Sequence, residues 1–294
     1  MADRRQLEES FRDTVNWSIY NDKLNRLTEE AKKSTIVYDE DYINETKVLK
    51  SFNTHIEVVE GTTFNVARRY VNKGSKVAVL NFANPHNPGG GVVNGAMAQE
   101  ECLCRSSNLY QCLTTDVARE DYYDYNIKYT NYLFSDRVIF SDNVTVFKDD
   151  SVIPVMMKEE DWFRVSVITC AAPYLGQTEK IVYPVLKDIF KKRIRNILEA
   201  AYRNNIDILI LGAFGCGAFK NPPRLVAEAF EETIMEEYKG MFKEIIFAIK
   251  KTSEECPNYN AFKEVFAQYM SEGQKIKEQP DSKGTEDVST YHAN

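Results

Sequence analysis

The chain has 294 residues, of which 43% are hydrophobic and 28% charged, a composition typical of a soluble globular protein. Its net charge of −7 argues against a protein that grips nucleic acid through phosphates, because such proteins present a basic face. No apolar run reaches the length of a membrane span, and the charged residues 1–27 do not resemble a signal peptide. We therefore expect a cytoplasmic protein with no membrane contact and no direct nucleic-acid binding.

The cysteines favour the same compartment and argue against a metal centre. Six are scattered along the chain without a Cys-x-x-Cys pair, and only three histidines accompany them. They are Cys102, Cys104, Cys112, Cys170, Cys216 and Cys256. This spacing does not favour a structural zinc site, whereas buried reduced thiols suit a cytosolic protein. We expect no metal ion and no cofactor.

The N-terminal segment 4–33 is predicted to be helical, since Leu7, Phe11, Val15 and Ile19 recur at helical spacing. Strand-like and helix-like segments then alternate. The predicted strands cover residues 56–60, 76–82, 165–170, 207–211 and 244–250, with a hairpin over 137–148 that turns at 141–143. The predicted helices cover residues 63–72, 96 to beyond 109, 180–204, 222–238 and 260–270.

Continuous apolar strands that alternate with helices predict an α/β sheet covered by helices on both faces. No linker is long enough to demand two domains. We expect a helical N-terminal extension over residues 1–50, a single core over 51–272, and a polar, disordered tail over 273–294.

Two glycine-rich loops follow buried strands of this sheet. The first contains Gly89-Gly90-Gly91 and comes after strand 76–82; the second spans residues 212–219 and comes after strand 207–211. Ligands of open α/β sheets bind at the carboxyl ends of strands, where backbone amides form an anion nest. Either loop alone could be a tight turn, but the pair predicts a clamp for a diphosphate. Neither loop has the dinucleotide fingerprint or the P-loop ending, which disfavours ordinary dehydrogenases and nucleoside triphosphatases.

Two adjacent carboxylates lie close behind the first loop. The stretch Asn84-Pro85-His86-Asn87-Pro88-Gly89-Gly90-Gly91 is followed, after a seven-residue spacer, by Gln99-Glu100-Glu101. This pattern resembles the signature of bacterial-type poly(ADP-ribose) glycohydrolases, which are divergent macrodomains. Residues 105–110, 141–150 and the loop 212–219 are also similar to that family, although it usually has a proline and an arginine where Thr145 and Lys148 stand.

The resemblance implies a macrodomain-like mixed sheet sandwiched by helices, and an enzyme that hydrolyses ribose–ribose O-glycosidic bonds. Poly(ADP-ribose) or ADP-ribosylated proteins would be its substrates and ADP-ribose its product, released from chain ends. Glu101 would be the general acid and Glu100 would hold ribose hydroxyls. The substrate-binding residues implied are Asn84, Gly89, Gly90, Gly91, Gln99, Gly215, Cys216, Gly217, Ala218 and Phe219.

The physical chemistry of two neighbouring glutamates favours one of them as the acid. Most glycosidases place two carboxyl groups on opposite sides of the bond, ~5 to 9 Å apart, whereas adjacent helical side chains diverge by roughly 100°. Glu100 and Glu101 are therefore not expected to flank a bond. A single acid–base glutamate, with water oriented by the substrate's own diphosphate, fits the sequence better.

Other interpretations stay open at this stage. The chain could be a macrodomain that binds ADP-ribose without hydrolysis, or a hydrolase of mono-ADP-ribosylated or acetylated ADP-ribose substrates. Glu100 and Glu101 could be solvated residues of a first helical turn. We expect Cys216 to be a small packed thiol and Phe214 a core aromatic, and we assign no catalytic role to His86.

Overall fold

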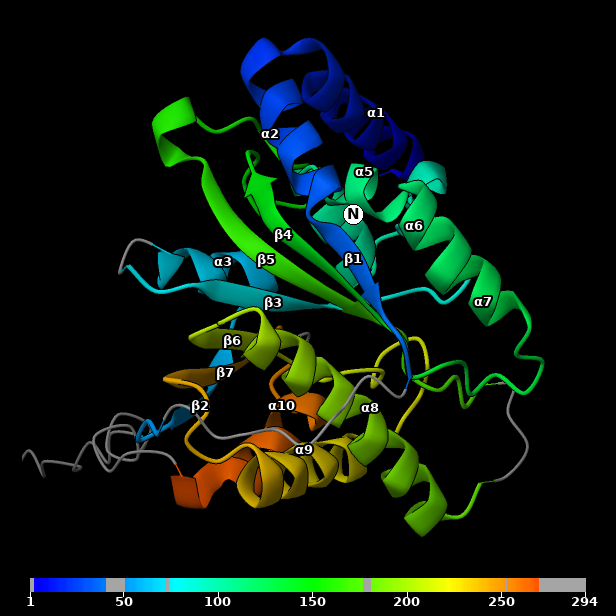
Figure 1. Cartoon of the computed structure of the whole chain (residues 1–294), viewed down its shortest axis with the longest axis vertical. Helices are drawn as coiled ribbons and strands as arrows, with labels where there is room; N and C mark the ends of the chain where they lie inside the picture. The colour runs from blue at the N-terminus through cyan, green and yellow to red at the C-terminus, as the bar shows by residue number, and fades with distance from the viewer. Residues whose placement is uncertain (1–2, 41–50, 72–73, 177–180, 252, 270–294) are drawn as a thin grey trace, which may run out of the picture.

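A seven-stranded mixed sheet forms the centre of the computed structural model, which describes residues 3–40, 51–71, 74–176, 181–251 and 253–269 (Figure 1). The strand order is β1-β4-β5-β3-β6-β7-β2. The strands are β1 (Thr35–Tyr38), β2 (His55–Glu60), β3 (Val77–Phe82), β4 (Val138–Val146), β5 (Phe163–Cys170), β6 (Ile208–Leu211) and β7 (Glu244–Ile249). Strand β4 runs antiparallel to both its neighbours, and the other adjacent strands are parallel.

Helices cover both faces of this sheet, so the predicted α/β class and the macrodomain-like sandwich are confirmed. One layer is built by α8 (Tyr183–Arg203), α9 (Pro223–Glu237) and α10 (Pro257–Phe266). The other layer includes α1 (Arg4–Tyr20), α2 (Asp22–Lys33), α3 (Thr63–Arg68), α4 (Gln99–Ser106), α5 (Leu109–Leu113), α6 (Asp116–Ala118) and α7 (Asp124–Ile127). A short π-helix, η3 (Arg119–Tyr123), joins α6 to α7, and 3₁₀ turns η2, η4 and η5 cover Val92–Asn94, Glu159–Asp161 and Ala267–Tyr269.

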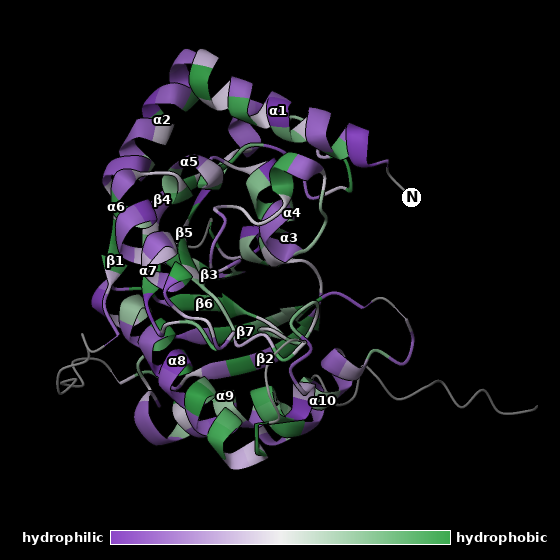
Figure 2. Cartoon of the chain, turned by 90° about the vertical axis from the view of Figure 1, so that its right-hand side faces the viewer, coloured by the Kyte–Doolittle hydropathy of each residue, from purple (hydrophilic) through white to green (hydrophobic). Residues whose placement is uncertain are grey.

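The strands are apolar on both faces because each face is covered. In β3, Ala78 and Leu80 pack toward the layer of α8, α9 and α10, while Val77 and Val79 pack toward the opposite layer. All four side chains are buried. Figure 2 shows the same arrangement, with largely hydrophobic strands between helices that carry both hydrophilic and hydrophobic residues. This explains why the sequence shows continuous apolar runs in place of the alternation of a half-exposed sheet.

The predicted strands at residues 56–60, 76–82, 165–170, 207–211 and 244–250 are confirmed with ends that differ by at most two residues. The hairpin predicted over 137–148 is wrong. These residues form one strand, β4, with a register shift between Ser141 and Val144. Asn143 adopts a left-handed backbone with φ of 58°, and the Asp142 carboxylate accepts a hydrogen bond from the Ser166 hydroxyl at 2.6 Å. The polar triplet is therefore a bulge held by its neighbour β5, and the chain does not reverse there.

The helix predicted from Ala96 past Leu109 is also wrong, because it is broken. Helix α4 ends at Ser106, and Ser107 is extended with φ of −147° and bridges to Val146 of β4. Asn108 continues this tie to β4, since its side-chain oxygen accepts a hydrogen bond from the Thr145 amide at 2.8 Å. A helix across this point would lose these bonds to the sheet.

The N-terminal extension contains more than helix. Its predicted helix over 4–33 is divided at Asn21, whose side chain caps α2 by accepting from the Leu24 amide. Residues 35–38 then form β1, an edge strand paired with β4. Residues 41–50 and the predicted tail 273–294 lie outside the described residues. Among the described residues, no helix is both long enough and apolar enough to cross a membrane.

A buried lysine ties the extension to the core. Lys148 lies where the resembled family usually has arginine, and its side chain is 2% exposed. Its ammonium group binds the Asp13 carboxylate at 2.7 Å and the Ser10 carbonyl at 3.2 Å, both on α1. The positive charge at this position therefore holds α1 against the end of β4.

Candidate active site

The two glycine loops meet at one edge of the sheet, as predicted, because β3 and β6 are parallel neighbours. The rings of Phe82 and Phe214, one at the start of each loop, lie 5.9 Å apart. Phe214 is fully buried, which confirms its prediction as a core aromatic. The two loops therefore begin side by side at the carboxyl ends of the central strands.

Gly90 is the point at which the first loop approaches both carboxylates. Its φ of 60° is in the left-handed region, and Gly89 beside it has φ of 67°. A Cβ at Gly90 would lie 2.4 Å from Glu101 Oε1 and 3.0 Å from Glu100 Oε2. Only glycine satisfies this backbone conformation and this close approach together.

Glu100 is buried at the start of α4 and is held by donors from β3 and from the first loop. Its Oε1 accepts from Asn81 Nδ2 at 3.1 Å, and its Oε2 accepts from the Asn84 amide at 2.7 Å. The Gly89 amide also faces this carboxyl group. Asn81 was not among the residues singled out from the sequence. The available signal was a single amide side chain within the otherwise apolar run 77–82.

Burial raises the pKa of Glu100 to about 8. Desolvation is the largest cause, and the nearby Glu101 carboxylate acts in the same direction, while the donors at Asn84, Asn81 and Gly89 oppose it. This pKa keeps most Glu100 side chains protonated at neutral pH. The active site thus holds a proton next to Glu101.

We expect the free energy of unfolding to fall with rising pH because of Glu100. The folded state binds more protons than the unfolded state between pH 4.5 and about 8, so the contribution is fully present below pH 4.5 and is lost as pH rises through the folded pKa. The slope is at most ~1.4 kcal/mol per pH unit. Urea unfolding from pH 5 to 8 should show the wild type losing stability relative to Glu100→Gln. A constant difference between the two proteins would contradict the raised pKa.

Glu101 is the third residue of α4 and is bound by two backbone donors. Its Oε1 accepts from the Gly91 amide at 2.9 Å, and its Oε2 accepts from the Ala98 amide at 2.8 Å. Its exposed fraction is 7%, compared with 2% for Glu100. The two side chains therefore do not diverge as their spacing in the helix predicts: both bend back to the glycine loop. The two carboxyl groups therefore converge on Gly90, and the single-acid mechanism stays a prediction.

The backbone amides of the two loops differ in their hydrogen-bond partners. In the first loop, the Gly91 amide donates to Glu101, the Gly90 amide donates to the Asn87 carbonyl at 2.9 Å, and the Gly89 amide faces Glu100. In the second loop, the amides of four of the predicted binding residues have no hydrogen-bond partner among the described residues. They belong to Gly215, Gly217, Ala218 and Phe219. The first loop therefore orients the carboxylates, and the second loop has free donors for an anion.

Two predicted binding residues have local structural bonds. Gln99 bridges α3 and β3, because its amide nitrogen donates to Thr63 Oγ1 at 3.0 Å and to the Leu80 carbonyl at 2.7 Å. Its oxygen accepts from the Phe82 amide at 2.9 Å. Asn84 Oδ1 accepts from the amides of His86 and Asn87, both at 2.9 Å, which holds the turn before the glycines.

The remaining predicted residues lie around the second loop. Gly217 and Ala218 are exposed, and Phe219 is partly buried. Phe219 packs against the Tyr174 ring, with ring centroids 5.2 Å apart. Burial raises the pKa of the Cys216 thiol, which agrees with a packed thiol and not with an activated nucleophile. Among the described residues, no group of three or more His, Cys, Asp or Glu side chains is arranged to hold a metal ion.

A mixed sheet between helices, with two glycine loops at one edge and two buried glutamates behind the first loop, defines a macrodomain-like hydrolase. The family described as "Microbial-type PARG, catalytic domain", where PARG is poly(ADP-ribose) glycohydrolase, matches residues 15–149. A comparison with curated proteins found no match.

Solved structures extend this similarity over most of the chain. PARG from Thermomonospora curvata, bound to the inhibitor ADP-HPD, is 30% identical with a TM-score of 0.80, over 88% of this chain and 99% of that one. PARG from Deinococcus radiodurans, in complex with ADP-ribose, is 33% identical with a TM-score of 0.74, over 82% of this chain and 97% of that one. The chain therefore belongs to the microbial-type poly(ADP-ribose) glycohydrolase family, and its class is that of a glycosidase.

Proposed function

We propose that the protein cleaves the ribose–ribose O-glycosidic bonds of poly(ADP-ribose) from chain ends and releases ADP-ribose, with Glu101 as the general acid. The observation that carries this proposal is the convergence of Glu100 and Glu101 on Gly90, beside a loop with free anion donors. Macrodomain-like PARG structures that hold ADP-ribose or ADP-HPD support the same ligand class here.

The chemistry of the bond cleavage uses one carboxyl group twice. The anomeric C–O bond breaks, its electron pair leaves with the departing ribose oxygen, and Glu101 gives that oxygen a proton. Water then adds to the oxocarbenium-like carbon and returns a proton to the Glu101 carboxylate. Glu100 lies beside it and holds the ribose hydroxyls. The backbone donors at Gly91 and Ala98 keep the Glu101 side chain directed into the loop.

The diphosphate of the substrate is assigned to the second loop. The unbonded amides of Gly215, Gly217, Ala218 and Phe219 supply its donors, with Cys216 between them. Phe219 packs under the ribose that is cleaved. The amides of Gly89, Gly90 and Gly91 already bond Glu100, the Asn87 carbonyl and Glu101, respectively. These glycines therefore contact the substrate through their Cα atoms.

The roles of Asn84 and Gln99 follow from their remaining atoms. The side-chain nitrogen of Asn84 has no hydrogen-bond partner among the described residues, so it is assigned to a ribose hydroxyl. Gln99 acts on the substrate indirectly, by fixing α4 against β3. All six cysteines are free thiols, which supports a reducing, cytoplasmic location.

Release of ADP-ribose from labelled, automodified polymer is the direct test. We expect free ADP-ribose to accumulate from polymer. Two other substrates, a protein that carries a single ADP-ribose and free acetylated ADP-ribose, should be turned over at least ~100-fold more slowly, because the proposed acid protonates a ribose leaving oxygen. If ADP-ribose appears early in the reaction without short poly(ADP-ribose) fragments, the polymer is cleaved from its chain ends. If the protein binds ADP-ribose without turnover of any of these substrates, it is a binding macrodomain. If it turns over the acceptor with a single ADP-ribose faster than polymer, that acceptor and not the polymer is its substrate.

A further inference from the structure

The segment before β4 has an unusual backbone for its residue types. Tyr132 and Phe134 have φ of 57° and 61°, in the left-handed region, where a bulky side chain is a true outlier. Such conformations cost of order 1–3 kcal/mol each and persist only where the surroundings impose them. The contacts that impose this conformation therefore indicate what the segment does.

Phe134 links the two loops of the active site. Its ring packs edge-on against His86 of the first loop, with centroids 5.3 Å apart at 90°. It also contacts Phe219 of the second loop, with centroids 6.4 Å apart. Phe219 packs on its other neighbour, Tyr174, which in turn meets Tyr132 at 6.2 Å. The segment 132–134 thus forms an aromatic wall around Phe219.

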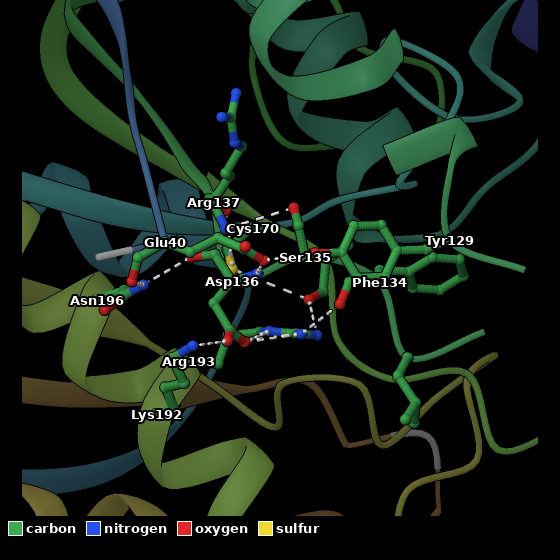
Figure 3. A network of polar contacts seen from close by, with 12 residues as sticks. Glu40, Tyr129, Phe134, Ser135, Asp136, Arg137, Cys170, Lys192, Arg193 and Asn196 are labelled. Carbon is green, nitrogen blue, oxygen red and sulfur yellow. Dashed lines mark hydrogen bonds and ion pairs between the residues drawn. The ribbon is translucent and has the colours of Figure 1, made fainter. Parts of the chain in front are cut away.

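One buried guanidinium group holds this wall in place. Arg193 of α8 is 1% exposed, and its Nη2 donates to the Phe134 carbonyl at 3.2 Å (Figure 3). Its Nε and Nη2 bind Asp136 Oδ1 at 3.0 and 2.9 Å, and its Nη1 donates to the Ala171 carbonyl at 2.7 Å. Ala171 comes directly after β5. Arg193 therefore fastens the wall to the carboxyl end of the sheet.

Packing alone does not hold the outer side of this segment. A pocket of about 390 Å³ lies between it and α8, lined in part by Leu133, Phe134, Val185 and Ile189. The pocket is also lined by an ion pair, in which Lys192 Nζ lies 3.0 Å from Asp136 Oδ2. On this side, Phe134 is held by the Arg193 guanidinium and by the ring contacts, while hydrogen bonds from the Tyr174 amide to the Tyr132 carbonyl and from the Ser135 amide to Asn126 Oδ1, both at 2.8 Å, hold the chain on either side.

We infer that Arg193 and Phe134 are positioning residues that set the place of Phe219 beneath the ribose to be cleaved. Arg193 acts through Asp136 and the Phe134 carbonyl, and Phe134 acts through its ring on Phe219 and His86. This inference rests on the proposed function in one respect, the assignment of Phe219 to that ribose. It adds two residues that have no contact with substrate in the proposed mechanism.

The test compares each variant with the wild type for two ligands, one that carries this ribose and one that ends at its β-phosphate, so that the charge difference between the ligands cancels. ADP-ribose carries the distal ribose and ADP lacks it, so calorimetric Kd values for both ligands isolate that subsite. For Arg193→Lys and Phe134→Leu we expect affinity for ADP-ribose to fall about 10-fold and affinity for ADP to stay within about 3-fold of wild type. Turnover of polymer should fall at least 10-fold, because misplacing the ribose by about 1 Å is enough.

Two variants control for a general loss of packing. Arg195→Lys changes another arginine of α8, one paired with Glu237 away from the wall. Phe262→Leu removes a fully buried ring in α10 that packs on Phe247 at 5.2 Å. Both controls should leave both Kd values and turnover unchanged within about 3-fold.

The outcomes separate this inference from the proposed function. Equal weakening of ADP and ADP-ribose, or no change in either, would overturn the positioning roles. A wild-type protein that binds ADP-ribose but releases none from polymer would overturn the proposed function, while the ratio of the two Kd values still decides the inference. Failure of the wild type to bind ADP-ribose would overturn both.

Discussion

The Glu101→Gln variant is expected to lose at least ~1000-fold in the release of ADP-ribose from polymer, with the Kd for ADP-ribose within about 3-fold of wild type. Removal of a general acid typically costs ~100- to 10,000-fold, and glutamine keeps the shape of the side chain without its proton. The second loop, with its free amides, is untouched by the change. Single-turnover assays and calorimetry on the same preparation would measure both quantities.

Glu100→Gln is the matched comparison, one residue away in the same helix. Because burial raises the pKa of Glu100 to about 8, its carboxyl group is mostly neutral at pH 7, and glutamine resembles that neutral form. We therefore expect its loss of turnover to be at least about tenfold smaller than the loss in Glu101→Gln. The reverse order would transfer the acid role to Glu100. Retention of more than a tenth of wild-type turnover in Glu101→Gln would show that Glu101 is not the acid.

Gly90→Ala is expected to lower turnover at least about 100-fold, although Gly90 carries no reactive group. The added Cβ would lie 2.4 Å from Glu101 Oε1 and 3.0 Å from Glu100 Oε2, so one or both carboxyl groups must move. Because alanine is strained at the left-handed φ of 60°, the variant should also lose roughly 1–2 kcal/mol of unfolding free energy. Turnover of polymer and urea unfolding would separate the two effects.

Gly74→Ala isolates the backbone cost in the same protein. Gly74 has φ of 71°, and a Cβ there would meet no atom of the described residues within 4 Å. This variant should lose roughly 1–2 kcal/mol of unfolding free energy and keep wild-type turnover. If Gly90→Ala loses stability to the same extent and also keeps its turnover, the contact between the glycine loop and the carboxylates has no catalytic importance.

The chemistry of the family signature follows from these contacts. The glycines let the backbone come close enough for its amides to hold Glu101 and face Glu100, and the spacer returns the chain to the start of α4. In the proposed mechanism, the second loop binds the diphosphate of the substrate. Under this proposal, the main role of the triple glycine is to hold the glutamate proposed as the acid, and its contact with the substrate is secondary.

Much of the fold was predictable because the sheet is buried on both faces. Continuous apolar runs such as Val77–Phe82 have no other stable environment in a protein of this size, so the runs predict strands with ends that are nearly correct. The same reasoning fails where a polar residue continues a strand. Ser141, Asp142 and Asn143 have turn-like composition, yet β5 and Lys76 bind them into β4 as a bulge.

The sequence by itself determined five of the seven strands, the two glycine loops at the end of the sheet and the glutamates behind the first loop, because these depend on local apolar runs and on short spacings. Only the tertiary structure decided three contacts. Both carboxyl groups approach Gly90, Asn81 donates a hydrogen bond to Glu100, and Arg193 donates one to the Phe134 carbonyl. Phe134 and Arg193 are 59 residues apart in the chain. No local pattern relates such partners, since the strand order of the sheet is what brings them together.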